Sequence, residues 1–472
     1  MIRKLRAIQK LAASGELADP NPLLLALSDP EPAVRQTAAL AFAQLGDPRA
    51  RSALEASLND PEAAVRAGAA EALGRLGRRE SRLSLEALLH DPVARVREQA
   101  AWALWAIADS GSAPALLNAR HDPDAQVRWS VTTALGRMRT PDAVEALHEA
   151  LADSNDRVRR EAVLGLGHSK DPRAPKWARP LLEDSAQRVR IAAAVVLGGF
   201  GDHSAVPSLL RRLNVADVWE KPSLLVALGR IADPTAIPAL VLATDDRAHW
   251  VRVCALHALG EIGSPDGREA ARRGVKDPAW AVRGAAADCL GRVGTSEDLP
   301  RLLELLEDPH PWPRRGAIYA LGRLDLIEAA PRIREELDDP TAEVRLATAW
   351  TLGRLGDDGA REALAVMLRH LPSAPKTGRT LAQGDGAVKL LSDADERLFD
   401  TIVQALGRLG QGETDPLVAQ ALREARARVP EEELDRLARL PEIESLPGRP
   451  PLTLRVLFDS AIPGSVEEGE LG

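Results

Sequence analysis

The chain has few of the residues that mark several common classes of protein. Its 472 residues include only two cysteines, which gives no basis for a disulfide framework. No apolar run approaches the roughly 20 residues that a membrane-spanning helix needs. The first twenty residues also lack the sustained apolar stretch of a signal peptide. These absences favour a soluble, cytoplasmic protein.

Basic charge and aromatic residues are also in short supply. The chain has 61 Lys and Arg against 69 Asp and Glu, so no basic excess predicts binding to nucleic acid or to an anionic membrane. Aromatic residues make up only 3%, and the apolar residues are mostly Ala, Leu and Val. This composition favours thin layers of closely packed helices.

What the chain does have is a period: an aspartate and an arginine six residues apart recur every 31 residues. The aspartates are Asp29, Asp60, Asp91, Asp122, Asp153, Asp184, Asp246, Asp277, Asp308 and Asp339. The arginines are Arg35, Arg66, Arg97, Arg128, Arg159, Arg190, Arg252, Arg283, Arg314 and Arg345. One frame has Val215 and Lys221 instead. A fixed period of this length indicates a stack of similar units, which grows by addition and needs no division into several globular domains.

Each frame predicts two helices joined by short turns. Asp60 and Pro61 predict the N-cap and the first residue of a helix that ends at Gly77. A second helix begins at pairs such as Asp47-Pro48 and leads to the next aspartate. Glycine recurs inside the first helix, for example at Gly74, where it costs about 1 kcal/mol relative to alanine. This glycine indicates either a close approach of helices or early fraying, and the sequence leaves the choice open.

The paired Asp and Arg of one frame cannot meet on one helix face, because they are six residues apart. Stacked helices lie about 8–10 Å apart, so the arginine can reach the aspartate or the turn carbonyls of a neighbouring unit. We therefore expect a structural ladder between repeats and not an anion-binding strip.

The consensus D-P-x-x-x-V-R-x-x-A-A-x-A-L-G-x-L-G, seen at 29–46 and 60–77, resembles the HEAT repeat, specifically the short bacterial form named after phycobilisome lyases. The resemblance covers about residues 20–370 and resumes at 393–410. It implies an all-α, right-handed solenoid of stacked helical hairpins, tied by the Asp–Arg ladder. It also implies helix-bending prolines in the outer helices, at Pro114, Pro207, Pro238, Pro300 and Pro331. HEAT arrays mostly serve as scaffolds, so the resemblance indicates fold much more than function.

The period breaks once. The next aspartate is due at position 370, which is His370, and the Leu-Gly-Arg-Leu-Gly signature returns late, which places the missing frame at Asp393 after 23 extra residues. We predict an N-terminal capping helix (1–19), a HEAT solenoid (20–370), an inserted flexible loop (371–392), a last repeat with capping helices (393–440), and an extended, disordered tail (441–472). The sequence leaves open whether the loop or the tail is functional.

Tryptophan dominates the few aromatic residues, with nine Trp against four Phe and one Tyr. Three tryptophans lie four residues after the frame position, one lies three after it, and a second aromatic set lies seven or eleven after it. The predicted partner-binding residues are Trp102, Trp129, Trp219, Trp250, Trp280, Trp312, Tyr319 and Trp350. Trp side chains dominate the energetics of protein interfaces, so this set predicts a groove that binds a protein or peptide. The alternative is that these rings fill gaps between repeats.

Two groups of residues have the chemistry of metal ligands. Cys254, His257 and Asp288 are legitimate zinc ligands, but small residues occupy the cysteine positions in other frames, so apolar filling is favoured. His148-Glu149 resembles one of the His-Glu dipeptides that bind iron in deoxyhypusine hydroxylase, a HEAT-repeat enzyme. Matching frames hold no second pair, so we predict no metal and no cofactor.

The sequence favours a non-enzymatic scaffold or adaptor that binds a protein or peptide, with no nucleic-acid or membrane partner. The alternative is a HEAT-type enzyme, such as a chromophore-handling protein like a phycobilin lyase, although only the name of the repeat supports it. A DNA glycosylase-like protein would use Trp350, Tyr319 and Asp288, but the chain lacks a basic groove. A metal-dependent hydroxylase is the remaining alternative. The identity of the partner and the oligomeric state stay open.

Overall fold

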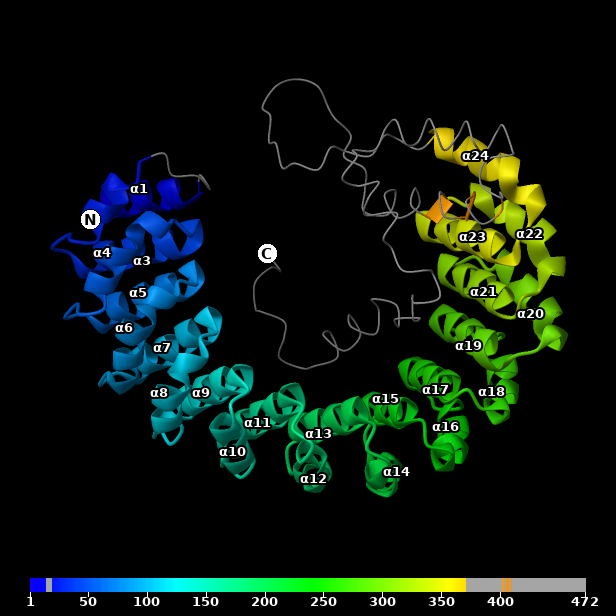
Figure 1. The fold of residues 1–472 in the computed structure, drawn as a ribbon, viewed down its shortest axis with the longest axis horizontal. Coiled ribbons are helices and arrows are strands. Elements are labelled where there is room, and N and C mark those ends of the chain that lie inside the picture. Colours follow the sequence, from blue (N-terminus) through cyan, green and yellow to red (C-terminus); the bar gives the residue numbers. More distant parts are fainter. Residues whose placement is uncertain (14–18, 371–400, 403–404, 407–408, 410–472) are drawn as a thin grey trace. The chain divides into compact units, whose positions relative to one another are not determined.

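A computed structural model of the protein describes residues 1–13, 19–370, 401–402, 405–406 and 409 (Figure 1). In this part of the chain the secondary structure is helical, from α1 to α24, with short 3₁₀ turns and no strand. The chain divides into two compact units, unit 1 (Met1–Val215) and unit 2 (Ala216–Gly472). Stacked helical hairpins in both units confirm the predicted all-α solenoid.

Each hairpin contributes one helix to each of two layers (Figure 1). The first layer of unit 1 consists of α3 (Pro32–Leu45), α5 (Ala63–Leu76), α7 (Ala94–Ile107), α9 (Ala125–Met138), α11 (Asp156–Ser169) and α13 (Gln187–Phe200). The first layer of unit 2 consists of α15 (Lys221–Ile231), α17 (His249–Ile262), α19 (Trp280–Val293), α21 (Pro311–Arg323) and α23 (Ala342–Leu355). Within each unit, consecutive first-layer helices pack directly on one another.

The second layer contains the shorter helices. In unit 1 these are α2 (Asn21–Ala26), α4 (Arg51–Ser57), α6 (Arg82–Ala87), α8 (Ala113–Ala119), α10 (Pro141–Ala150), α12 (Ala174–Ala178) and α14 (Val206–Val215). In unit 2 they are α16 (Ile237–Ala243), α18 (Arg268–Gly274), α20 (Leu299–Glu304), α22 (Ala330–Glu335) and α24 (Arg361–His370). The core lies between the layers, where apolar residues at helical spacing, such as Val65, Leu73 and Leu85, are fully buried.

The predicted cap of the second helix at Asp47 is correct, but the predicted cap of the first helix at Asp60 is wrong. Asp47 accepts the backbone N–H of Arg49 at 2.9 Å and begins the 3₁₀ turn that precedes α4. Asp60 instead accepts the N–H of Glu62 at 2.9 Å, while α5 begins only at Ala63 with extended Glu62 as its N-cap residue. The frame aspartate therefore closes a turn just before the helix, and its remaining oxygen lone pairs are available to the neighbouring repeat.

The glycines inside the first helices mark close approaches and not frayed ends. A Cβ atom added at Gly74 would lie 2.7 Å from the Cα atom of Ala103 in the next first-layer helix, and one at Gly229 would lie 2.7 Å from the Cα atom of Ala258. Both glycines are inside helices that continue beyond them. Glycine at this position lets adjacent repeats pack backbone against backbone.

Two further contacts extend the array at its ends. Helix α1 (Ile2–Ala13) packs on α3, and Lys4 pairs with Asp29 at 2.5 Å across the same 25 residues that separate Arg35 from Asp60. At the other end, Gly353 contacts Ala405, which lies 52 residues later, whereas Gly74 and Ala103 are 29 residues apart. The difference equals the 23 extra residues counted from the sequence. The predicted loop (371–392) and tail (441–472) lie outside the described residues, and the predicted domain boundaries remain predictions.

Candidate functional site

The charged side chains of the Asp–Arg ladder pair with one another between neighbouring repeats. Arg97 donates from Nε and Nη2 to the two carboxylate oxygens of Asp122 at 2.6 and 2.8 Å, and from Nη1 to the carbonyl oxygen of Asp91 at 2.8 Å. The side chains of Arg97 and Asp122 are only 12% and 7% exposed. The pKa of Asp122 is below its ordinary value: burial alone would raise it, but the hydrogen bonds from Arg97 and from the N–H of Asp124 outweigh burial.

The same ion pair recurs along both units. The pairs are Arg35–Asp60, Arg66–Asp91, Arg97–Asp122, Arg128–Asp153, Arg159–Asp184, Arg252–Asp277, Arg283–Asp308 and Arg314–Asp339, with Lys4–Asp29 and Lys221–Asp246 as lysine versions. The ladder is therefore structural, as the spacing predicted, and a binding site must be sought elsewhere.

The side of each first-layer helix that faces away from the second layer offers the clearest surface for binding. In α21, Pro313, Ala317 and Leu321 are buried. Trp312 and Tyr319 are only half-buried, and they lie on another side of the helix. These two occupy positions four and eleven after the frame aspartate. We call the surface formed by positions three, four, seven, eleven and fifteen after the frame position, on successive first-layer helices and the turns that precede them, the open face.

One aromatic pair lies at the start of unit 2. Trp219 and Trp250 stack with ring centroids 5.6 Å apart and an interplanar angle of 19°. Trp250 is held in place, since it is half-buried and its indole Nε1 donates to the carbonyl oxygen of Val218 at 3.3 Å. Trp219 is 49% exposed. The pair thus presents one accessible ring on top of an anchored one.

A second aromatic cluster repeats this arrangement on α19 and α21. Trp280 is 40% exposed, stacks on His310 at 3.8 Å and lies 5.7 Å from the ring of Trp312. Trp312 is half-buried and fills the space above Gly284, where an added Cβ atom would lie 2.6 Å from the Trp312 Cδ1 atom. Glycine at position 284 therefore makes room for the ring. The sequence did not single out His310, whose only signal is its place two residues after the frame aspartate.

The remaining predicted residues form edge-to-face contacts. In unit 2, Tyr319 and Trp350 lie 5.4 Å apart. In unit 1, Trp102 contacts both Trp105 and Trp129, with centroids 5.6 and 5.3 Å apart, and all three are half-buried. Trp105 was not among the predicted residues.

The structure thus brings the predicted set together in local clusters, each within one unit. Most of the rings pack between repeats, as the alternative interpretation stated. Trp219 and Trp280, however, each expose more than a third of their surface on the open face of unit 2. Their role in binding stays a prediction.

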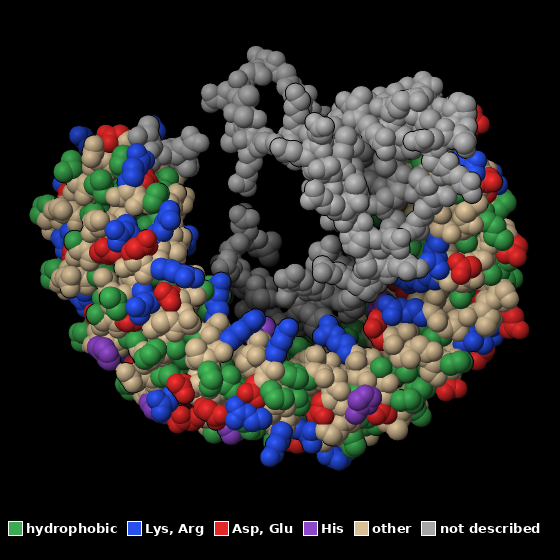
Figure 2. Space-filling view, viewed as in Figure 1, with side chains coloured by type: hydrophobic (Ala, Val, Ile, Leu, Met, Phe, Trp, Pro, Cys, Tyr) green, Lys and Arg blue, Asp and Glu red, His purple; other side chains and the backbone are tan. Residues whose placement is uncertain are grey.

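The position four residues after the frame aspartate has a different residue type in unit 1. Four residues after the frame aspartate, unit 1 has Arg95, Arg157 and Arg188 where unit 2 has tryptophan. The side chains of Arg95 and Arg188 are 66% and 46% exposed, and each has an acidic partner, Glu98 or Asp156. Lys and Arg side chains are visible along the first layer of unit 1 (Figure 2). At position four, three repeats of unit 1 therefore have arginine and three repeats of unit 2 have tryptophan, whereas the other repeats have Ala, Gln or Glu there.

The two groups with metal-ligand chemistry contact other side chains or are buried. Burial raises the pKa of the Cys254 thiol to about 12, and Cys254 packs in the core as a small side chain. The described residues contain no group of three or more His, Cys, Asp or Glu side chains placed to hold a metal ion. His148 stacks on Trp177 at 4.1 Å in the second layer, and Glu149 pairs with Arg120 at 3.0 Å.

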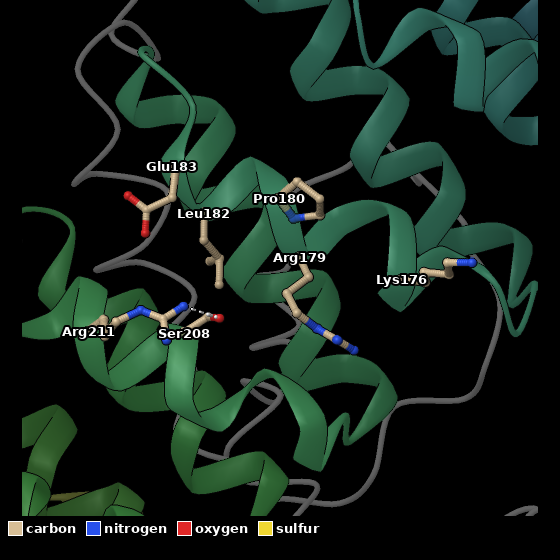
Figure 3. A pocket seen from close by; sticks show the side chains of 7 residues that line it. All are labelled: Lys176, Arg179, Pro180, Leu182, Glu183, Ser208 and Arg211. Atoms are coloured by element: carbon tan, nitrogen blue, oxygen red, sulfur yellow. Dashed lines mark hydrogen bonds between the residues drawn. The ribbon is translucent and has the colours of Figure 1, made fainter.

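A cavity of about 310 Å³ lies in the second layer of unit 1 (Figure 3). Its lining residues are Lys176, Arg179, Pro180, Leu182, Glu183, Ser208 and Arg211. Arg179 already pairs with Asp202 at 2.8 Å, Arg211 donates to Ser208 at 2.9 Å, and the Lys176 ammonium points away from Arg211 (Figure 3). The three cations do not converge, so the cavity is no candidate for an anion site.

Comparisons with known proteins agree with this architecture. A family profile described as HEAT repeats matches seven overlapping stretches, residues 20–105, 83–163, 113–185, 145–223, 177–253, 242–322 and 299–382. Among solved structures, a crystal structure of importin beta is similar with a TM-score of 0.56 and 15% identity over 89% of this chain. That match covers 66% of the importin beta chain, so this chain spans just under two thirds of its length.

A complex of CpcE and CpcF of phycocyanin lyase from Nostoc sp. PCC7120 matches at a TM-score of 0.34 and 22% identity, over 52% of this chain and 96% of that chain. No curated protein sequence matches at the required significance. None of the described helices is long and apolar enough to cross a membrane.

Proposed function

The chain belongs to the HEAT-repeat family, and we propose that it is a non-enzymatic scaffold that binds a protein or peptide on the open face of unit 2. The single observation that carries this proposal is the pair of exposed tryptophans, Trp219 stacked on Trp250 and Trp280 stacked on His310. A stacked ring is held in one orientation before a partner arrives, so binding costs little side-chain entropy.

Burial of these rings is a sufficient driving force for recognition. Truncation of a tryptophan at the centre of an interface typically costs 2 kcal/mol or more, which is about thirtyfold in affinity. The two exposed rings belong to different clusters of one unit, so an extended partner that follows the first layer meets both. Binding along an extended surface is the mode that stacked repeats favour.

The decisive variant is Trp219→Ala with Trp280→Ala in the full chain. Trp250 and Trp312 are poorer targets, because their rings pack between repeats and their loss would perturb the fold. A matched control is Leu242→Ala with Ile327→Ala, which removes exposed apolar side chains from the second layer of the same unit.

The measurement is affinity capture from native lysate with quantitative mass spectrometry, using wild type, variant and control. Circular dichroism first verifies that all three are equally helical. We expect wild type and control to retain the same partners and the tryptophan variant to lose at least about 90% of them, as a thirtyfold loss of affinity implies. Equal capture by the tryptophan variant would refute the proposed site.

A further inference from the structure

Arg315, on the open face of unit 2, has no hydrogen-bond or ion-pair partner among the described residues. Its Nε atom is enclosed without an acceptor in this part of the chain. Its neighbour Arg314 binds Asp339 at 2.7 Å and the carbonyl oxygen of Asp308 at 2.8 Å. Arg323, about two turns further along α21, lies 3.9 Å from Asp288. Arg315 is therefore a half-buried cation without a carboxylate partner in the described part of the chain.

Aromatic rings hold this cation in place. The Arg315 Cζ atom lies 4.5 Å from the centroid of the Trp312 ring, within the range of a cation–π interaction. Trp312, Arg315 and Tyr319 are three and four residues apart, so they share one face of α21. The guanidinium plane is thus oriented by a ring while its outer donors have no acceptor among the described residues.

The surroundings define the chemistry of a ligand. Half-buried charges form stronger hydrogen bonds than those fully in water, so an anion on Arg315 gains a charge-assisted, bidentate contact. One uncompensated positive charge matches a carboxylate, whereas a phosphoryl group carries about two negative charges at neutral pH. The exposed ring of Trp280 lies 5.7 Å from Trp312 and offers apolar surface beside the cation.

We propose that Arg315 is the anchor for an acidic, partly apolar segment of a separate protein, a conclusion that rests on the proposed scaffold function. An Asp or Glu carboxylate of the segment accepts from the guanidinium of Arg315. A neighbouring aliphatic or aromatic side chain covers the Trp280–Trp312 surface. An extended chain advances about 3.3 Å per residue, so the two side chains are about two residues apart.

The test starts from a defined probe, a phage-displayed library of random 12-residue peptides selected on the immobilised full chain. We expect enrichment of Asp or Glu within three residues of Leu, Phe, Pro or Trp. Absence of acidic enrichment, or enrichment of Lys and Arg, would overturn the proposal.

The best selected peptide is then synthesised and its Kd measured against three full-length proteins. Arg315→Gln should weaken binding at least about tenfold, which is the expected loss of a charge-assisted hydrogen bond. Arg332→Gln on α22, in the second layer, should leave the Kd unchanged. The Tm of Arg315→Gln should stay within about 4 °C of the wild-type value, because the residue makes no ion pair within the described chain and loses only its contact with the Trp312 ring. Unchanged affinity for Arg315→Gln would refute the anchor.

Two further outcomes separate this proposal from the scaffold proposal. If selected peptides depend on Trp219 and Trp280 but not on Arg315, the anchor is wrong and the scaffold proposal stands. If they depend on neither, both proposals are wrong. A synthetic peptide of residues 450–472, which contains Asp459 and three glutamates, is tested in parallel. If it binds through Arg315 more tightly than any selected peptide, the occupant is this chain's own segment, which overturns the assignment to a separate protein.

Discussion

The ladder makes the strongest quantitative prediction, and Arg97–Asp122 in the middle of unit 1 is the place to test it. Asp122→Asn keeps the oxygen that accepts the N–H of Asp124 but loses the charge that holds Arg97. Removing one partner of a buried ion pair costs about 3–5 kcal/mol. Because these side chains are 12% and 7% exposed and asparagine keeps one acceptor, we expect a loss of about 2–3 kcal/mol. Asp122→Ala should cost about 1 kcal/mol more, since it also removes the turn acceptor.

The assay must report local stability, because stacked repeats lose structure unit by unit and need not unfold in two states. Native-state hydrogen exchange of the amides in α7 and α9 measures the free energy of opening where the ladder is cut. Asp142→Asn on α10 is the control, since Asp142 is exposed. The control should change the free energy of opening by less than about 0.5 kcal/mol, as expected for a surface substitution. An equally small change for Asp122→Asn would refute the conclusion that the ladder stabilises the stack.

The same pair predicts a pH dependence with a definite sign. The pKa of Asp122 is lowered in the folded protein. Its contribution is therefore fully present above about pH 4, the ordinary aspartate value, and is lost as the pH falls through the folded pKa. The difference in the free energy of opening between wild type and Asp122→Asn should consequently be constant from pH 5 to 8 and shrink in stronger acid. A difference that grows on acidification would contradict this linkage.

Two other predictions follow from the packing of individual residues. Gly229→Ala should destabilise unit 2 by about 1–3 kcal/mol in urea unfolding, because its Cβ atom would lie 2.7 Å from the Cα atom of Ala258. Gly199→Ala should not destabilise unit 1, because nothing lies within 4 Å of the added Cβ atom. Equal effects of the two substitutions would refute the close-approach argument. Burial and the nearby charge of Asp339 raise the pKa of Glu336 to about 7, so stability should fall as the pH rises from about 4.5 to 7. Glu336→Gln should raise the free energy of unfolding by about 1–2 kcal/mol at pH 8 and by less than half of that at pH 5, and an equal gain at both values would exclude this ionisation as the cause.

The candidate site was only partly accessible to sequence reasoning. The period placed Trp219, Trp250 and Trp312 at one frame position, and the structure does bring Trp219 against Trp250. The period alone could not distinguish Trp219, which is 49% exposed, from Trp250, whose indole N–H donates a hydrogen bond to the carbonyl oxygen of Val218. That difference depends on the backbone of the adjacent repeat, which no single frame encodes.

Arg315 was missed for the same reason. Its neighbour Arg314 stands out because it falls in the repeated Asp–Arg frame, whereas Arg315 occupies a position that varies between repeats. Only the arrangement of side chains shows that Arg315 lies on the Trp312 ring and has no carboxylate partner within the residues that the structure describes. A cation's lack of partners is a property of its whole surroundings and leaves no local mark in the sequence.

The sequence by itself determined the architecture. Helix length, helix ends and the Asp–Arg spacing are local signals, and their repetition ten times over made the all-α stack and its ladder predictable. The tertiary structure alone decided that the frame aspartate closes a turn before the helix, that Gly74 marks a backbone contact with Ala103, and that Lys4 begins the ladder. The physical reason is that these features arise between repeats, where each position meets side chains about 25–30 residues away.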